Sequence, residues 1–220
     1  MKNKLIVALD VNSFAQAKRL IDKLSSHVNI FKVGSQLFTA CGPKIIDYIN
    51  RKKKKVFLDL KFYDIPNTVE KAVLSAAKHK AFMLTLHASG GFEMLRRAKN
   101  AFKGMKKRPL LVAVTVLTSK DEKNTKTKVL DLAKLSKKAG LNGIVCSPRE
   151  TWLVKKVCGK NFIVVNPGIR PVWAAKHDQK RITTPKEAVK SGADFIVVGR
   201  PITEVENPDI AAKKILEELT

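Results

Sequence analysis

The sequence predicts an α/β protein, a (β/α)8 (TIM) barrel formed by one domain over residues 1–220. Eight short apolar runs recur along the chain, and segments with helical periodicity lie between them. Strands that alternate with helices form parallel sheets with right-handed crossovers, and eight such units in 220 residues match a small barrel. A doubly wound sheet is the alternative, but its usual glycine-rich first turn is missing from residues 9–14.

The expected strands are apolar runs with β-branched or aromatic residues and polar or turn-forming ends. In chain order they are Leu5–Leu9, Ile30–Val33, Val56–Leu60, Phe82–Leu86, Leu110–Val116, Gly143–Cys146, Phe162–Val165 and Phe195–Val198. The expected helices place apolar residues three or four positions apart along one face. They are Phe14–Leu24, Lys44–Ile49, Thr68–Ala77, Phe92–Ala101, Val129–Ala139, Arg149–Val157, Lys186–Val189 and Ile210–Leu219.

Composition favours a cytoplasmic protein with a sizeable core. Hydrophobic residues make up 45% of the chain, yet no run approaches the about 18 apolar residues of a membrane span. The apolar start resembles a signal peptide until Asp10 interrupts it, which leaves too short a hydrophobic region. Cys41, Cys146 and Cys158 lack the spacing of a metal or redox motif, so we expect buried free thiols.

The net charge of +24 favours anionic ligands and permits contact with nucleic acid. The excess is mostly lysine in pairs and short runs, such as Lys52–Lys55, at the expected helix ends and turns. Aromatic residues do not interleave with these runs, and no recognition-helix or RNA-binding pattern accompanies them. We therefore interpret the lysines as a solvated surface and expect no nucleic-acid partner.

Charged residues stand out in the third apolar run and just after it. Residues two apart on a strand share a face, so Asp59 and Lys61 are expected to point the same way. Asp64 follows the strand, which places an ammonium between two carboxylates and keeps Lys61 protonated as a proton donor. The alternative is a structural ion pair. Pro66 ends the strand, and Asn67 with Glu70 predicts the capping box of the next helix.

Polar or turn-forming residues lie at the carboxyl end of every expected strand. In order they are Asp10, Lys32, Asp59 with Lys61, His87, Thr118 with Ser119, Ser147, Asn166 to Gly168, and Gly199 with Arg200. In a barrel these ends meet at one mouth, where active sites lie. Asp10 and Lys32 are expected to join Asp59 and Lys61 in an alternating array of charges. His87 alone is more typical of a structural histidine.

Two features predict a phosphate site. Gly199 and Arg200 follow the eighth strand, where barrels of this kind bind phosphate through backbone N–H groups and a forked side chain. The longest connection, residues 167–185, contains Arg170, Gln179 and Arg181, and connections of this length often form lids. The sequence has no metal-binding motif, so we expect no bound metal.

These motifs together resemble the orotidine 5′-phosphate decarboxylase family along nearly the whole chain. The matching segments are residues 9–10, 31–34, 59–68, 87–91, 114–119, 145–147, 167–171, 178–181 and 198–203. The Asp-x-Lys-x-x-Asp core is shared with related sugar-phosphate enzymes. Its continuation into Ile-Pro-Asn-Thr, with Pro-Gly-Ile-Arg and Asp-Gln-x-Arg further on, is more specific. Tyr63 departs from the pattern, because many members have histidine there.

The resemblance implies decarboxylation of orotidine 5′-monophosphate to uridine 5′-monophosphate, the last step of pyrimidine synthesis, without metal or cofactor. It implies that Lys61 gives a proton to C6 and that Asp59 lies beside the departing carboxylate. Asp64 and Thr68 are implied to reach the active site of the other subunit of a homodimer. The implied substrate contacts are Asp10 and Lys32 to ribose, Thr118 and Ser147 to the pyrimidine, and Arg170, Gln179, Gly199 and Arg200 to the phosphate.

Two alternatives to this function remain at the level of the sequence. The first is a related phosphosugar enzyme, either a hexulose-phosphate synthase or a keto-gulonate-phosphate decarboxylase. Those relatives use magnesium and lack the Asp-Gln-x-Arg pattern. The second is a basic RNA-binding protein on a barrel scaffold, which a steep salt dependence of specific RNA binding would reveal.

Overall fold

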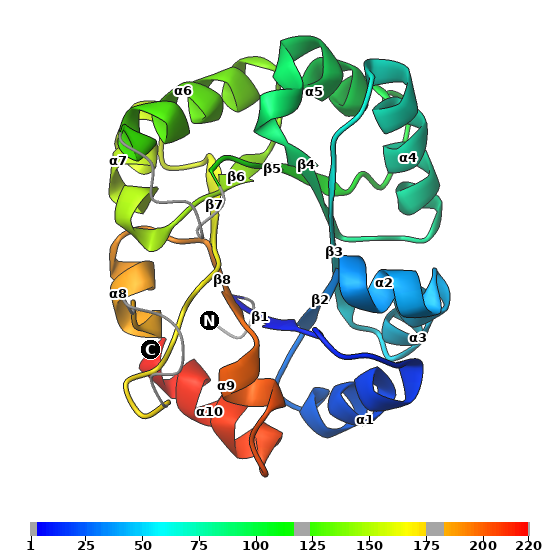
Figure 1. Ribbon diagram of the computed structural model, residues 1–220, viewed down its shortest axis with the longest axis vertical. Helices are drawn as coiled ribbons and strands as arrows, with labels where there is room; N and C mark the ends of the chain where they lie inside the picture. Colours follow the sequence, from blue (N-terminus) through cyan, green and yellow to red (C-terminus); the bar gives the residue numbers. More distant parts are fainter. Residues whose placement is uncertain (1–3, 117–123, 175–182, 220) are drawn as a thin grey trace.

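Eight parallel strands pair in chain order and close on themselves, so that β1 lies against both β2 and β8 (Figure 1). The computed structural model describes residues 4–116, 124–174 and 183–219. The helices surround the strands on the outside of the ring (Figure 1). The predicted (β/α)8 barrel is therefore confirmed.

The strands lie close to the apolar runs of the sequence. They are β1 (Leu5–Ala8), β2 (Ile30–Gly34), β3 (Lys55–Phe62), β4 (Met83–His87), β5 (Leu110–Val114), β6 (Gly143–Val145), β7 (Ile163–Asn166) and β8 (Phe195–Val198). The principal difference is β3, which continues through Phe62 past its expected end at Leu60.

Each expected helix overlaps an observed one, and the first of them, Phe14–Leu24, matches at both ends. The helices are α1 (Phe14–Leu24), α2 (Ser35–Cys41), α3 (Lys44–Arg51), α4 (Pro66–Lys78), η1 (Ala88–Gly90), α5 (Gly91–Asn100), α6 (Thr125–Lys138), α7 (Pro148–Cys158), α8 (Pro185–Lys190), α9 (Arg200–Thr203) and α10 (Pro208–Glu218). The short elements α2, η1 and α9 were not expected, because each spans too few residues to establish a periodic pattern. Within the residues that the structure describes, no helix is long and apolar enough to cross a membrane.

The predicted capping box at Asn67 and Glu70 is wrong. Helix α4 begins at Pro66, with Ile65 as its N-cap and no side-chain cap. Proline suits the first helical position because its φ is preset and it has no N–H to satisfy. Asn67 therefore already lies inside the first turn, and Glu70 forms an ion pair with Arg97 of α5.

Alternate residues of each strand pack into two separate apolar clusters. The larger cluster contains strand residues such as Val7 together with apolar residues of the surrounding helices. The smaller cluster fills the barrel interior with Ile6, Ala8, Ile30, Phe57, Met83, Val112, Val165 and Val197. Burying one large apolar side chain stabilises the fold by about 1.5–3 kcal/mol, so both layers hold the strands in place. The interior is thus packed below the carboxyl ends, where the polar residues lie.

Candidate active site

A cavity of about 340 Å³ lies at the carboxyl ends of the strands. Its floor includes Ala8, Phe57 and Val197 of the interior cluster. Its charged lining residues are Asp10, Lys32, Asp59, Lys61, Arg170 and Arg200. Six residues predicted from separate parts of the chain are therefore brought to one cavity.

Strand register explains why Lys32 points into this cavity. Its neighbours across the sheet are Ala8 of β1 and Phe57 of β3, and both line the cavity. Gly34, two residues on, leaves room for the ammonium. A Cβ at Gly34 would lie 3.0 Å from Lys32 Nζ and 3.3 Å from Asp10 Oδ1. A glycine at this strand end therefore lets the lysine fold over the backbone toward Asp10.

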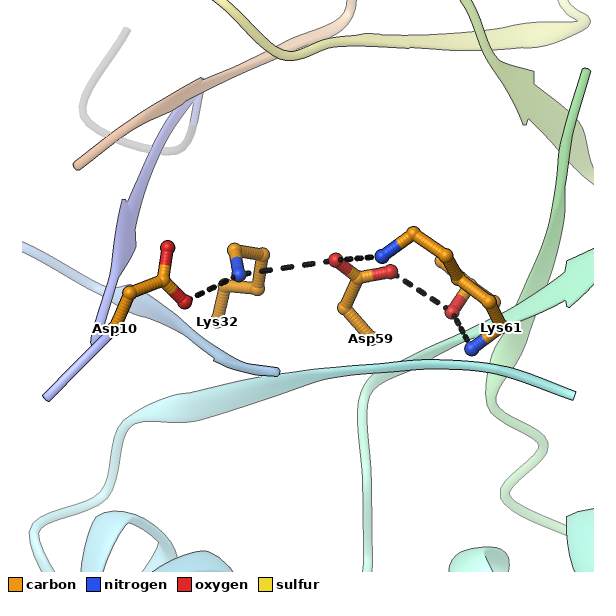
Figure 2. Close-up of polar contacts among 5 residues, drawn as sticks. Asp10, Lys32, Asp59 and Lys61 are labelled. Carbon is orange, nitrogen blue, oxygen red and sulfur yellow. Dashed lines mark hydrogen bonds and ion pairs between the residues drawn. The ribbon is translucent and has the colours of Figure 1, made fainter. Parts of the chain in front are cut away.

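Four charges of alternating sign form a continuous row from β1 to β3 (Figure 2). Lys32 Nζ donates to Asp10 Oδ1 at 2.9 Å and lies 3.7 Å from Asp59 Oδ2. Lys61 Nζ donates to the same Asp59 oxygen at 3.0 Å. The predicted array of Asp10, Lys32, Asp59 and Lys61 is present, with Lys32 as the ammonium between two carboxylates.

Exposure differs along the row. The side chains of Lys32 and Asp59 are only 11% and 13% exposed, whereas that of Lys61 is 39% exposed. Opposite charges attract more strongly where water is excluded, so water weakens the attraction between Lys32 and Asp59 less than it weakens that of more exposed pairs. Lys61 reaches the open part of the cavity, which gives its ammonium access to a bound molecule.

Asp59 and Lys61 share a side of β3, but the strand between them is irregular. Phe57 and Leu58 pair with Met83 and Leu84, whereas Phe62 pairs with Leu86, so β3 holds extra residues opposite β4. Lys61 has φ of +51°, in the left-handed region. Its side chain is thus directed by a bulged backbone and not by simple alternation.

Thr85 is a residue of the site that sequence reasoning missed. It is fully buried in β4, its hydroxyl donates to Asp59 Oδ1 at 3.0 Å, and it accepts from the Lys61 N–H at 2.8 Å. The available signal was a lone polar residue inside the apolar run 82–86. Polar groups are seldom buried without a partner, so a threonine in this run predicts a hydrogen bond to another buried group.

Asp64 lies outside the charge array. Its carboxylate accepts from the N–H of Ile65 at 2.6 Å and is exposed. Among the described residues, the ion pairs of Lys61 include Asp59 but not Asp64. The expectation that one ammonium lies between Asp59 and Asp64 within the chain is therefore wrong, because the chain turns away after Phe62. Thr68, in the first turns of α4, is also exposed.

The opposite side of the cavity contains the residues predicted to bind phosphate. Arg170 is only 3% exposed, and its backbone N–H donates to Thr183 O at 3.0 Å, which joins the two ends of the connection after β7. Gly199 and Arg200 line the cavity at the start of α9. The predicted residues Gln179 and Thr118 lie outside the described residues.

Ser147 and His87 lie at the edge of the site. Ser147 is the N-cap of α7, where its Oγ accepts from the Arg149 N–H at 3.4 Å, and it does not line the cavity. His87 stacks against Tyr63 with ring centroids 5.6 Å apart, and its Nδ1 accepts from the Ser89 N–H. Both residues therefore support local structure beside the cavity.

Cys146 is the one cysteine among the lining residues of this cavity. It is fully buried, and burial strongly raises the pKa of its thiol. A thiol in this state stays protonated near neutral pH and is a poor nucleophile. Across the described parts of the chain, no group of three or more His, Cys, Asp or Glu residues is placed to hold a metal ion.

Comparisons with known proteins identify the family of this chain. The family described as "Orotidine 5′-phosphate decarboxylase / HUMPS family" matches residues 3–215. The chain is 47% identical to orotidine 5′-phosphate decarboxylase of Geobacter sp. (strain M21), over 98% of this chain and 95% of that protein. It is 48% identical to the enzyme of that name from Geotalea daltonii, with the same coverage.

A solved structure is similar in both fold and sequence. The crystal structure of orotidine 5′-phosphate decarboxylase from Lactobacillus acidophilus superposes with a TM-score of 0.86 at 35% identity, covering 99% of each chain. The match thus extends over the barrel and over every strand that supplies the cavity. On the family match and these full-length relatives, the chain belongs to the orotidine 5′-phosphate decarboxylase / HUMPS family.

Proposed function

We propose that this protein decarboxylates orotidine 5′-monophosphate to uridine 5′-monophosphate, the last step of de novo pyrimidine synthesis. The observation that carries the proposal is the Asp10–Lys32–Asp59–Lys61 row at the cavity, in a chain whose full-length relatives are named for this activity. We further propose that residues 1–220 act as one decarboxylase domain. A cytoplasmic location goes with the proposal, because its substrate is a phosphorylated metabolite.

The proposed chemistry uses the Lys61 ammonium twice. As the bond between C6 and the carboxylate breaks, CO2 leaves and the electron pair stays on C6. The ammonium stabilises that negative charge and then gives C6 a proton, and solvent restores the proton to the amine. No cofactor is required in this scheme, so preorganised charges must replace the electron sink that a cofactor supplies.

Asp59 lies 3.0 Å from the proposed proton donor and is nearly buried. A substrate carboxylate beside it meets a like charge, whereas neutral CO2 does not. The repulsion is therefore relieved as the reaction proceeds. The phosphate contacts lie across the cavity from Lys61, so their binding energy is available to hold C6 in position for the chemical step.

The other site residues are proposed to bind the rest of the nucleotide. Asp10 and Lys32 offer an acceptor and a donor to the ribose. The guanidinium groups of Arg170 and Arg200 supply forked donors to the phosphate. Gly199 has no side chain to block the approach of the phosphate to backbone N–H groups. We propose that Thr118 and Ser147 lie near the pyrimidine and that Gln179 binds the phosphate.

We also propose a homodimer in which Asp64 and Thr68 reach the active site of the other subunit. Three features support this: both side chains are exposed, Asp64 takes no part in its own subunit's charge row, and large apolar groups flank it. Tyr63 and Ile65 are 63% and 65% exposed. Adjacent exposed apolar side chains of this size are typical of a surface that a partner covers.

The deciding experiment follows ultraviolet absorbance of orotidine 5′-monophosphate mixed with the purified protein and a chelator. We expect the spectrum to change to that of uridine 5′-monophosphate. Lys61→Ala is expected to lower the rate by at least about 10²–10⁴-fold, the usual contribution of one acid–base group, while leaving the circular dichroism spectrum intact.

Two results would contradict the proposal. A folded Lys61→Ala variant with near-normal turnover removes Lys61 from the mechanism. Absence of decarboxylation by the folded wild-type protein removes the activity itself. The family description also includes the HUMPS group, so phosphosugars with magnesium would be tested next. Activity that survives chelation separates the two possibilities.

A further inference from the structure

The irregular pairing of β3 with β4 places a side-chain acceptor opposite a backbone donor of β3. Between the Leu58–Leu84 and Phe62–Leu86 pairs, β3 contains three residues and β4 only one, which is Thr85. The Lys61 N–H lies in this irregular stretch and donates to the Thr85 hydroxyl at 2.8 Å. A side chain on β4 therefore replaces the carbonyl that a regular strand would offer.

The direction of both bonds of this hydroxyl is fixed. A backbone N–H can only donate, so Thr85 Oγ1 must accept from Lys61. Its single proton is then available to Asp59 Oδ1, 3.0 Å away. The other oxygen of Asp59 accepts from Lys61 Nζ at 3.0 Å. Thr85 is thus bonded to the backbone of the lysine and to the carboxylate that holds the lysine's ammonium.

We propose that Thr85 is a positioning residue that sets the geometry of the Asp59–Lys61 pair for proton delivery to C6. The inference rests on the proposed decarboxylase function. Lys61 occupies the left-handed region at φ of +51°, where a side chain other than glycine is strained. The bond from its N–H to Thr85 helps to hold that conformation, while the second bond limits rotation of the Asp59 carboxylate.

Removal of this hydroxyl is expected to impair the chemical step more than substrate binding. The proposed phosphate residues, such as Arg200, come from the other side of the barrel and keep their places. Displacement of a proton donor by about 1 Å costs about 10²-fold in rate. An interaction that acts only at the transition state lowers kcat and leaves KM nearly unchanged.

The experiment compares Thr85→Val, which keeps the shape but loses the hydroxyl, with Thr85→Ser, which keeps the hydroxyl. We expect Thr85→Val to lower kcat about 10²-fold with KM within about threefold, and Thr85→Ser to restore most of kcat. Ser136→Ala is the control, because it deletes a fully buried hydroxyl that bonds Leu132 O on α6. It should leave kcat unchanged.

Hydrogen exchange provides a readout that is independent of activity. The Lys61 amide should exchange faster in Thr85→Val than in Thr85→Ser or the wild type, because only the valine variant lacks its acceptor. If Thr85→Val does not fold, Thr85→Ala serves as the hydroxyl-free variant. The proposal predicts the same loss of kcat and the same faster exchange of the Lys61 amide for Thr85→Ala as for Thr85→Val.

The outcomes separate this inference from the proposed function. An active wild type with an equally active, folded Thr85→Val variant overturns the positioning role but leaves the decarboxylase function intact. Equal losses of kcat in Thr85→Ser and Thr85→Val also overturn it, since side-chain volume and not the hydroxyl would then matter. A folded wild type that does not decarboxylate the substrate overturns both proposals.

Discussion

Lys61 Nζ lies 3.0 Å from Asp59 Oδ2, although the Lys61 backbone has φ of +51°. The left-handed conformation costs about 1–2 kcal/mol for a residue with a side chain. The surrounding strands impose it, and the ion pair and the bond to Thr85 help to maintain it. The fold thus holds the proposed proton donor in a conformation that an unconstrained lysine rarely adopts.

Arg200 provides a test of the phosphate side of the cavity. We expect Arg200→Ala to raise KM about 10–100-fold, because charge-assisted hydrogen bonds contribute about 1.5–3 kcal/mol. It should also lower kcat, since phosphate binding helps to place C6. Arg19→Ala, at an exposed position of α1, is the control for the loss of one positive charge. Unchanged affinity of Arg200→Ala for uridine 5′-monophosphate would exclude its phosphate contact.

Subunit complementation tests the proposed sharing of active sites. Lys61→Ala and Asp64→Ala are each expected to be inactive, but a mixed dimer regains one site with both native residues. After random exchange, half the dimers are mixed, so activity should recover to about a quarter of the wild-type level. Mass spectrometry of the intact dimers verifies the exchange. Absence of recovery in exchanged dimers would mean that each subunit supplies its own Asp64.

Gly143 of β6 is expected to tolerate no side chain. A Cβ at Gly143 would lie 2.1 Å from the backbone oxygen of Ile163, its neighbour on β7. The strands would have to move apart, so Gly143→Ala should lower the free energy of unfolding by about 1–3 kcal/mol. Denaturant titration measures this loss.

Gly90→Ala is the matched control for Gly143→Ala. The added Cβ would meet the end of the Met94 side chain, which can move, instead of backbone. We expect a smaller loss of stability for this variant. Equal losses at the two positions would show that backbone contact between β6 and β7 is not what requires Gly143.

Much of the site could be predicted because strand ends are easy to locate in this sequence. Asp10, Lys32 and Asp59 follow or interrupt apolar runs, and charges in such places are seldom accidental. Parallel pairing then brings neighbouring strand ends together, as the structure confirms for the row from Asp10 to Lys61. The eight-strand barrel follows from the same alternation.

The remaining features depend on contacts between strands that no local pattern reveals. The bulge at Lys61 arises from how β3 pairs with β4, and Thr85 acquires its role only through that pairing. Asn67 and Glu70 have the spacing of a capping box, but the helix begins at Pro66, two residues earlier than that box predicts. Proline is well suited to the first helical position, and this preference of Pro66 outweighed the capping preference of Asn67.

Asp22 of α1 lies outside the cavity and is surrounded by three hydrogen-bond donors. Lys52 Nζ lies 2.6 Å from its Oδ1, which also accepts from Tyr48 Oη at 2.6 Å. Lys18 Nζ donates to Oδ2 at 2.9 Å. The hydrogen bond from Lys52, followed by those from Tyr48 and Lys18, lowers the pKa of Asp22 far below its usual range.

A lowered pKa in the folded state means that ionised Asp22 stabilises the fold at neutral pH. That stabilisation is fully present above the unfolded pKa of about 4 and is lost as the pH falls through the folded value. Asp22→Asn should therefore reduce stability at pH 7 by about 1 kcal/mol, as for other partly exposed charge networks. The difference from wild type should shrink steadily below about pH 4.

Urea titrations of both proteins at several pH values measure this difference. Asp131→Asn, at an exposed position on α6, is the control for loss of a carboxylate as such. Because ionisation of Asp22 is what the asparagine removes, a stability difference that stays constant from pH 7 down to the acid limit contradicts the electrostatic explanation. It would instead assign the effect to altered packing of Tyr48 and the helix ends around it.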